Sequence, residues 1–148
     1  PRKPTLAGRL EVVDRLIEIA EKAGIENRLV DTTVLDAPDP GPTGKAVYLV
    51  KAKYGLPAGC GAHNAIEMWH KRRKVSEQIY LTGSVVANVL PIIMGANFML
   101  YGPVRRASAM YIPCALADAY VAYSMRQEYN IKPLTNNHPL FRVFTMET

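Results

Sequence analysis

Cysteine and histidine are scarce in this sequence of 148 residues, and their spacing argues against several kinds of site. The two cysteines, Cys60 and Cys114, lie far apart in apolar surroundings. They predict reduced thiols in a cytoplasmic protein rather than a disulfide framework. The three histidines, His63, His70 and His138, lie in three different contexts, so no metal-ligand spacing results and no metal site is expected.

Charge is absent from residues 81–104, which raises the question of a membrane span. A spanning helix needs about 20 predominantly apolar residues, whereas glycine, serine, asparagine and proline interrupt this stretch. A helix over 83–94, a turn at 95–97 and a short strand over 98–101 fit the pattern better. The sequence therefore predicts no transmembrane segment, and no signal peptide is expected at its start.

Charged residues make up 21% of the chain and hydrophobic residues 49%, which is typical of a globular domain and not of a disordered one. The net charge of +5 comes mostly from residues 71–74, KRRK, with Arg105 and Arg106 as a second group. Neither interleaved aromatic residues nor a nucleic-acid motif accompanies them, so a solvated helix face is favoured over nucleic-acid binding. A docking surface for an acidic protein or a phosphate-bearing ligand remains the alternative.

Hydrophobic periodicity predicts helices that alternate with short strands. Residues 5–23 read as an amphipathic helix that Thr5 caps and Gly24 ends. The order αβαβααβα, with short connections, predicts parallel strands joined by right-handed crossovers. The other expected elements are strands over 27–35, 56–62 and 98–101, and helices over 43–53, from 65 into the basic run, over 83–94 and over 106–128, the last kinked at Pro113.

Three strands this apolar must be covered on both faces, and none has the features of a natural edge strand. The fold class is therefore α/β, and residues 1–148 are explained better as one domain cut from a (β/α) barrel than as a complete small fold. Pro1 stands where an initiator methionine would be, and the chain opens directly on a helix. Further residues upstream are therefore expected.

The stretch 55–69, GLPAGCGAHNAIEMW, is the strongest candidate for a binding site. Small residues at the carboxyl end of a strand let a flat ligand approach the backbone closely. In α/β folds, ligands bind at this end of the strands. Asn64 stands where the dinucleotide fingerprint requires its third glycine after Gly59 and Gly61, so that fingerprint fails.

Three strand ends lie at one edge of the sheet if the strands are neighbours, namely residues 31–36, 61–64 and 101–105. Together they offer carboxylates, an amide, an imidazole, a phenol and a guanidinium. Cys60 precedes the loop without a placed base, and no carboxylate pair suited to hydrolysis is evident. The set favours a flat, hydrogen-bonding ligand over a hydrolytic substrate.

Three ordered blocks resemble a known family: LVDTTVLD (29–36), YGLPAGCGAHNA (54–65) and GANFMLYGPVRRASAMYIPCALADAYVA (95–122). They are similar to the carboxyl-terminal half of the H-type subunit of tetrahydromethanopterin S-methyltransferase, and equally to the methyltetrahydrofolate–corrinoid methyltransferases of bacteria. The closing HPLF (138–141) also fits the end of that family. The resemblance covers nearly the whole chain, and it implies a pterin-binding TIM (β/α)8 barrel. This chain would hold about the last three strands with their covering helices, and roughly the first half would be absent.

The resemblance implies methyl transfer between N5 of a tetrahydropterin, tetrahydrofolate or tetrahydromethanopterin, and the cobalt of a corrinoid carried by a partner protein. It implies that Asn64 is catalytic, because its amide can stabilise charge developing at N5. It also implies that Asp31 binds the pterin by accepting hydrogen bonds from the ring. Gly59, Gly61 and His63 complete the expected cofactor-binding set, and a homo-oligomer or larger methyltransferase complex is expected around it.

The choice of pterin stays open at this stage, although residues 31–41 and 46–51 look slightly more like the folate enzymes than like the archaeal protein. Each residue role also has a simpler alternative. Asn64 could merely cap a helix that starts at Ala65. Asp31 could be a partnered core carboxylate, and His63 is equally well explained as a packed neighbour.

The function class has an alternative as well. The chain could be a non-catalytic interaction module or an incomplete barrel fragment without independent activity. The activity of the 148 residues on their own is therefore left open.

Overall fold

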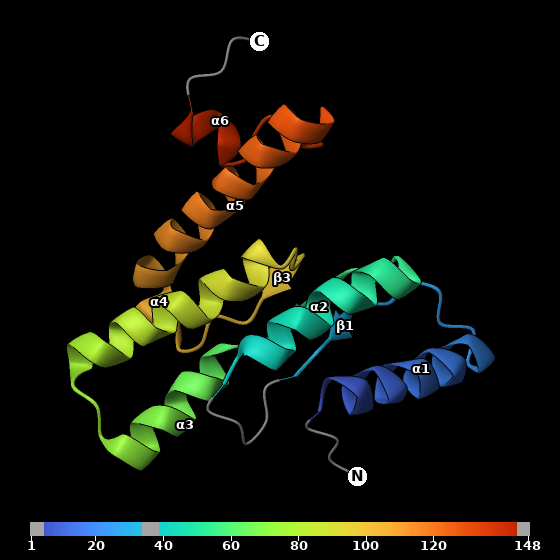
Figure 1. Ribbon diagram of the computed structural model, residues 1–148, viewed down its shortest axis with the longest axis horizontal. Helices are drawn as coiled ribbons and strands as arrows, with labels where there is room; N and C mark the ends of the chain where they lie inside the picture. The colour runs from blue at the N-terminus through green and yellow to red at the C-terminus, as the bar shows by residue number, and fades with distance from the viewer. Residues whose placement is uncertain (1–4, 34–38, 145–148) are drawn as a thin grey trace.

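The computed structural model describes residues 5–33 and 39–144 of the chain (Figure 1). Helices and short strands alternate along these ranges, as the periodicity predicts. The elements are α1 (Leu6–Lys22), β1 (Val30–Asp31), α2 (Gly41–Tyr54), β2 (Ala58–Cys60), α3 (His63–Arg73), α4 (Glu77–Ile93), β3 (Phe98–Met99), the 3-10 turn η1 (Val104–Arg106), α5 (Ala107–Tyr129) and α6 (Leu140–Val143).

Within the described ranges the strands form one parallel sheet in the order β1-β2-β3. Val30 pairs with Ala58, and Gly59 pairs with both Asp31 and Phe98. The predicted α/β class and the parallel strands are therefore confirmed. The strands are shorter than the sequence predicted, because α3 begins directly after Ala62 and leaves no room for β2 to extend to residue 62.

Local signals explain where α1 and α2 begin and end. The Thr5 hydroxyl accepts a hydrogen bond from the Gly8 backbone N–H at 3.1 Å, which confirms the predicted cap of α1. α2 begins at Gly41, earlier than predicted, because Pro42 stands in its first turn, where the missing N–H is not needed. It ends at Gly55, whose φ of 64° is the left-handed conformation of a helix C-cap.

Two helix starts differ from the sequence prediction. α3 begins at His63 instead of residue 65, with Ala62 at its N-cap, so the two polar residues of the candidate site belong to the helix. α4 begins at Glu77 instead of residue 83, because the Ser76 hydroxyl accepts a hydrogen bond from the Ile79 N–H at 3.4 Å and caps it. The predicted helix therefore missed the first turns of α4.

The central strand β2 is fully buried between helices. α2 packs Val47 and Val50 near Ala58, while Cys60 lies in a second apolar cluster with side chains of α3 and α4. Burial raises the pKa of the Cys60 thiol to about 11. Cys60 and Cys114 are both free thiols, as predicted.

The uncharged stretch 81–104 folds as predicted, into most of α4, a turn at Gly95 and β3. No helix within the described ranges is long and apolar enough to cross a membrane. Figure 1 shows α5 and α6 extending from the layer that α2, α3 and α4 form, while α1 lies on the side of β1.

Candidate functional site

The carboxyl ends of the three strands lie side by side, as the sequence predicted. Just beyond the strands, the Thr32 N–H donates to the Gly59 carbonyl at 2.9 Å, and the Leu100 N–H donates to the Cys60 carbonyl at 3.1 Å. Residues 31–33, 61–64 and 100–102 therefore share one edge of the sheet. This edge is the candidate site.

Asn64 lies in the first turn of α3 with its side chain exposed at this edge. Its backbone N–H donates to the Gly61 carbonyl at 3.2 Å. A methyl group placed on Gly61 would lie 3.5 Å from the Asn64 amide nitrogen, so the amide lies next to the strand end. Because Ala62 occupies the N-cap and the helix already includes Asn64, the interpretation of Asn64 as the cap is wrong.

Asp31 is the last residue of β1 and is exposed, which rules out the alternative of a buried core carboxylate. Its Oδ1 atom accepts a hydrogen bond from the Thr33 backbone N–H at 2.8 Å. This bond employs one carboxylate oxygen and fixes the side chain on its own turn. It places a negative charge beside the strand end that precedes Asn64.

The turn after β1 is held from a distance. Thr33 has a φ of 56°, which is uncommon for a residue other than glycine. The Arg9 guanidinium donates to the Thr32 carbonyl at 2.6 Å and also to the Thr33 carbonyl, and the Thr43 hydroxyl donates to the Thr33 carbonyl at 3.2 Å. Sequence reasoning missed Arg9 and Thr43, because they lie in α1 and α2 and only the fold brings them to Asp31.

The two glycines of the candidate site have different surroundings. A Cβ on Gly59 would lie 2.2 Å from the Phe98 carbonyl oxygen and 2.7 Å from the Phe98 ring, so the approach of β3 alone requires a glycine there. A Cβ on Gly61 would make only ordinary contacts, at 3.5 to 3.9 Å from Asn64 and Leu100. Gly61 therefore leaves the backbone at the strand end uncovered, which suits a flat ligand.

His63 is buried, with 4% of its surface exposed. Its Nε2 atom lies 3.0 Å from the Tyr80 hydroxyl and 3.3 Å from Glu67 Oε1. Its ring packs so closely on Gly102 that a Cβ there would lie 2.5 Å from it, and Gly102 has a φ of 104° that favours glycine. The structure gives His63 the position of a packed neighbour, and contact with a cofactor stays a prediction.

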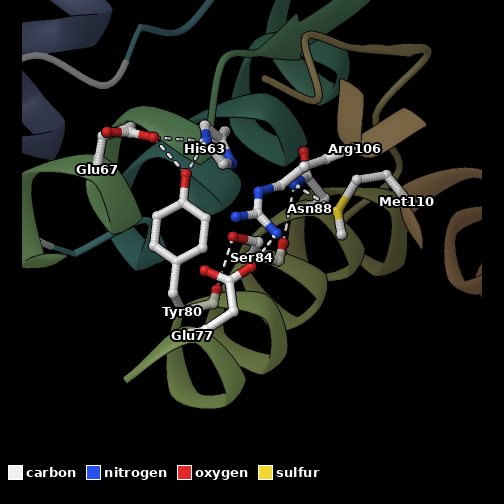
Figure 2. A network of polar contacts seen from close by, with 8 residues as sticks. All are labelled: His63, Glu67, Glu77, Tyr80, Ser84, Asn88, Arg106 and Met110. Atoms are coloured by element: carbon white, nitrogen blue, oxygen red, sulfur yellow. Dashed lines mark hydrogen bonds and ion pairs between the residues drawn. The ribbon is translucent and has the colours of Figure 1, made fainter. Parts of the chain in front are cut away.

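A buried polar stripe runs along α4, formed by Tyr80, Ser84 and Asn88 (Figure 2). The Ser84 hydroxyl donates to the Tyr80 carbonyl at 2.7 Å, and the Asn88 amide donates to the Ser84 carbonyl at 2.8 Å. Beside the stripe, Arg106 pairs with Glu77 at 2.6 Å and lies over the Tyr80 ring, 4.7 Å from its centroid. The sequence contained a signal for this stripe, because its members recur at every fourth residue of an otherwise apolar helix.

Comparison with known proteins decides the family. Residues 3–134 match the family model of the tetrahydromethanopterin S-methyltransferase MtrH subunit. The chain belongs to the MtrH family. This confirms the resemblance drawn from the three sequence blocks.

Curated relatives similar to this MtrH-family chain are the corresponding subunits of tetrahydromethanopterin S-methyltransferase from archaea. The relative from Methanocaldococcus jannaschii is 31% identical over 160 residues, covering 94% of this chain and 50% of the relative. Those from Methanothermobacter thermautotrophicus and Methanosarcina barkeri are 27% and 26% identical, covering 97% and 95% of this chain and 49% of each relative. The chain thus spans about half the length of the curated relatives it matches.

The contact between Tyr80 and Glu67 in this MtrH-family chain predicts a specific pH dependence. The hydrogen bond from Tyr80, with a further contribution from His63, lowers the pKa of Glu67 below its usual 4.5. A lowered folded-state pKa means that the stabilisation is fully present above about pH 4.5 and is lost as the pH falls through the lowered value. We therefore expect Tyr80→Phe to destabilise the protein most near neutral pH and progressively less in acid.

Thermal melting of both proteins across this pH range measures the effect. Tyr101→Phe is the matched control, because the Tyr101 hydroxyl lies 3.4 Å from the Tyr111 hydroxyl, a neutral partner. Its stability difference from the wild type is expected to stay constant between neutral pH and about pH 4. A Tyr80→Phe difference that stays equally constant would contradict the assigned contact.

Within residues 5–33 and 39–144, no group of three or more histidine, cysteine, aspartate or glutamate side chains is arranged to hold a metal ion. The candidate site of this MtrH-family chain therefore consists of the carboxylate of Asp31, the amide of Asn64 and the uncovered backbone at Gly61.

Proposed function

We propose that this MtrH-family chain is part of a methyltransferase that moves a methyl group between N5 of a tetrahydropterin and the cobalt of a corrinoid on a partner protein. The observation that carries the proposal is the position of Asp31 and Asn64 on neighbouring strand ends at one edge of a parallel sheet. The archaeal relatives, named for tetrahydromethanopterin, favour that pterin over tetrahydrofolate.

The residues at this edge fit a reduced pterin. Its aminopyrimidine ring is flat and presents a row of N–H donors, which an exposed carboxylate such as Asp31 can accept as charge-assisted hydrogen bonds. Gly61 has no side chain to obstruct a flat ring at the strand end. The bonds from Arg9 and Thr43 to the turn at Thr33 keep the Asp31 carboxylate in one place.

Asn64 would act at N5. A tertiary amine is a poor leaving group unless a hydrogen bond stabilises the charge that develops on it as the methyl group departs. An exposed amide in the first turn of a helix can supply this hydrogen bond without changing its own protonation state. When the corrinoid protein is bound, its cobalt supplies the nucleophile, so the chain contributes positioning more than reactivity.

We also propose that the three strands belong to a pterin-binding (β/α)8 barrel. Both β1 and β3 have an edge that no other strand of the described ranges covers. Beside the open edge of β3, a cavity of about 270 Å³ is lined by Phe98, Met99 and residues of α4 and α5. Further strands, from the same polypeptide or from another protein chain, would cover both edges, and the relatives are about twice as long as this chain.

Calorimetry on the full-length polypeptide tests the proposed function, with methyl-tetrahydromethanopterin and methyltetrahydrofolate as ligands. We expect binding, and tighter binding of the methanopterin form. Lack of binding to either pterin would overturn the proposal.

Asp31→Asn is expected to weaken pterin binding by about 10- to 100-fold, because hydrogen bonds to a charged group are worth about 1.5–3 kcal/mol. Asp31 holds the ring before and during methyl transfer, so the rate at saturating pterin should change little. Titration calorimetry and single-turnover rates on the same protein separate the two quantities.

Asp39→Asn is the matched control for this substitution. Asp39 is also exposed and accepts a backbone hydrogen bond two residues on, from Gly41 at 2.7 Å, but it belongs to the loop before α2. We expect wild-type affinity from the control. Equal loss of affinity in both variants would remove Asp31 from the proposed site.

A further inference from the structure

His63 ties α3 to α4 immediately beside Asn64. In the described part of the chain no side chain caps the start of α3, so its first turn lacks the usual fixation. The buried imidazole of His63, the first residue of this turn, is held instead. Tyr80 meets it edge-on, with ring centroids 5.8 Å apart and planes at 87°, and Gly102 packs on its face (Figure 2).

The hydrogen bonds of this cluster determine where the imidazole carries its proton. Ionised Glu67 has no proton to give, so its Oε1 accepts from the Tyr80 hydroxyl. The single phenol proton is thereby committed to Glu67. At 3.0 Å from His63 Nε2, the Tyr80 oxygen can then only accept, as can Glu67 Oε1 at 3.3 Å. Nε2 must therefore be the protonated nitrogen.

The second ring nitrogen, Nδ1, is buried and has no hydrogen-bond partner among the residues that the structure describes. Every hydrogen bond of the His63 ring within that part of the chain thus goes through Nε2 to Tyr80 and Glu67. A buried acceptor without a partner lowers stability, so stability alone does not explain the arrangement. What the arrangement does achieve is a single orientation of the ring.

We propose that Tyr80 and Glu67 are positioning residues for methyl transfer, which hold His63 as its Nε2–H tautomer and thereby fix the first turn of α3 that carries Asn64. This inference rests on the proposed function of Asn64. Neither residue needs to touch the pterin. They act by keeping the amide within the fraction of an ångström that a catalytic hydrogen bond requires.

Nitrogen-15 NMR of the histidine rings reads out the tautomer directly and does not depend on activity. We expect the Nε2–H tautomer for His63 in the wild-type protein. In Glu67→Gln, the Tyr80 proton is no longer committed to a carboxylate and can be donated to Nε2, so the Nδ1–H tautomer should become populated. A wild-type signal from the Nδ1–H form would overturn the inference, whatever the protein is found to catalyse.

The same variants are then compared in single-turnover methyl transfer. For Glu67→Gln we expect a rate lowered by about tenfold, with pterin affinity within about twofold of the wild type, because a misplaced amide affects mainly the transition state. Glu77→Gln is the matched control. Glu77 lies in the same cluster but pairs with Arg106, so we expect both tautomer and rate to be unchanged.

Tyr80→Phe keeps the ring packing and serves as a second variant if Glu67→Gln does not fold. Glu67 still accepts from Nε2 in this protein, so the tautomer should persist while the rate falls by about threefold. Normal rates in every folded variant would overturn the inference but leave the methyltransferase proposal intact. A wild-type protein that neither binds nor demethylates a pterin would overturn the proposed function, and the NMR result would still decide the tautomer.

Discussion

Asn64→Ala is expected to slow methyl transfer by about 10²-fold or more while pterin binding stays close to wild type, because loss of one preorganised donor typically has this effect on turnover. The amide would meet N5 mainly as charge develops there, so its loss belongs to the transition state. Single-turnover transfer and pterin titration on the full-length polypeptide measure the two quantities.

Stability separates this role from a structural one. Asn64 lies inside the first turn of α3 and not at its N-cap, and alanine is a better helix former than asparagine. We therefore expect the melting temperature of Asn64→Ala to reflect a change within about 1 kcal/mol. Asn137→Ala, an exposed change between α5 and α6, is the control for the rate. A fully active Asn64→Ala enzyme would end the catalytic assignment.

Gly59→Ala is expected to reduce stability by about 3 kcal/mol or more, at the upper end of the range for overpacked cores. The added Cβ would lie 2.2 Å from the Phe98 carbonyl oxygen, which belongs to the backbone of β3 and cannot rotate away. The strands would have to separate, or their register would have to change. Urea denaturation of the folded protein, or loss of soluble protein where folding fails, measures the effect.

Gly61→Ala is the matched control, two residues further along the same segment. Its Cβ would meet only side-chain atoms, the nearest at 3.5 Å, so its stability should stay within about 1 kcal/mol of the wild type. The pair therefore tests the register itself. If Gly59→Ala proved as stable as Gly61→Ala, the pairing of Gly59 with Phe98 would be wrong.

The fold could be predicted from the sequence to the extent that its signals are local. The Thr5 cap, the left-handed Gly55 and the apolar periodicity of α1 all act within a few residues, and the structure bears them out. The start of α3 was placed two residues late, because the His63–Asn64 pair reads as a polar loop. Its helical state depends on the burial of His63 against α4, which is a tertiary contact.

The candidate site divides along the same line. Asp31 and Asn64 were predicted from the strand ends on which they lie, and parallel pairing does bring those ends together. Arg9, Thr43 and Tyr80 were not predicted to bear on the site. Arg9 reaches Thr32 from 23 positions away in the sequence, and Tyr80 reaches His63 from 17 away. Contacts at such separations leave no periodic trace in a single sequence.

The composition of β2 has a consequence for the order of folding. Ala58, Gly59 and Cys60 offer little intrinsic preference for an extended chain, and their partners lie 28 residues earlier at Val30 and 39 residues later at Phe98. Loop closure over these distances must precede any reward from pairing. The central strand is therefore a late product of folding that forms once α2 and α4 have closed the two crossovers, and a nascent chain exposes Val30 and Phe98 until then.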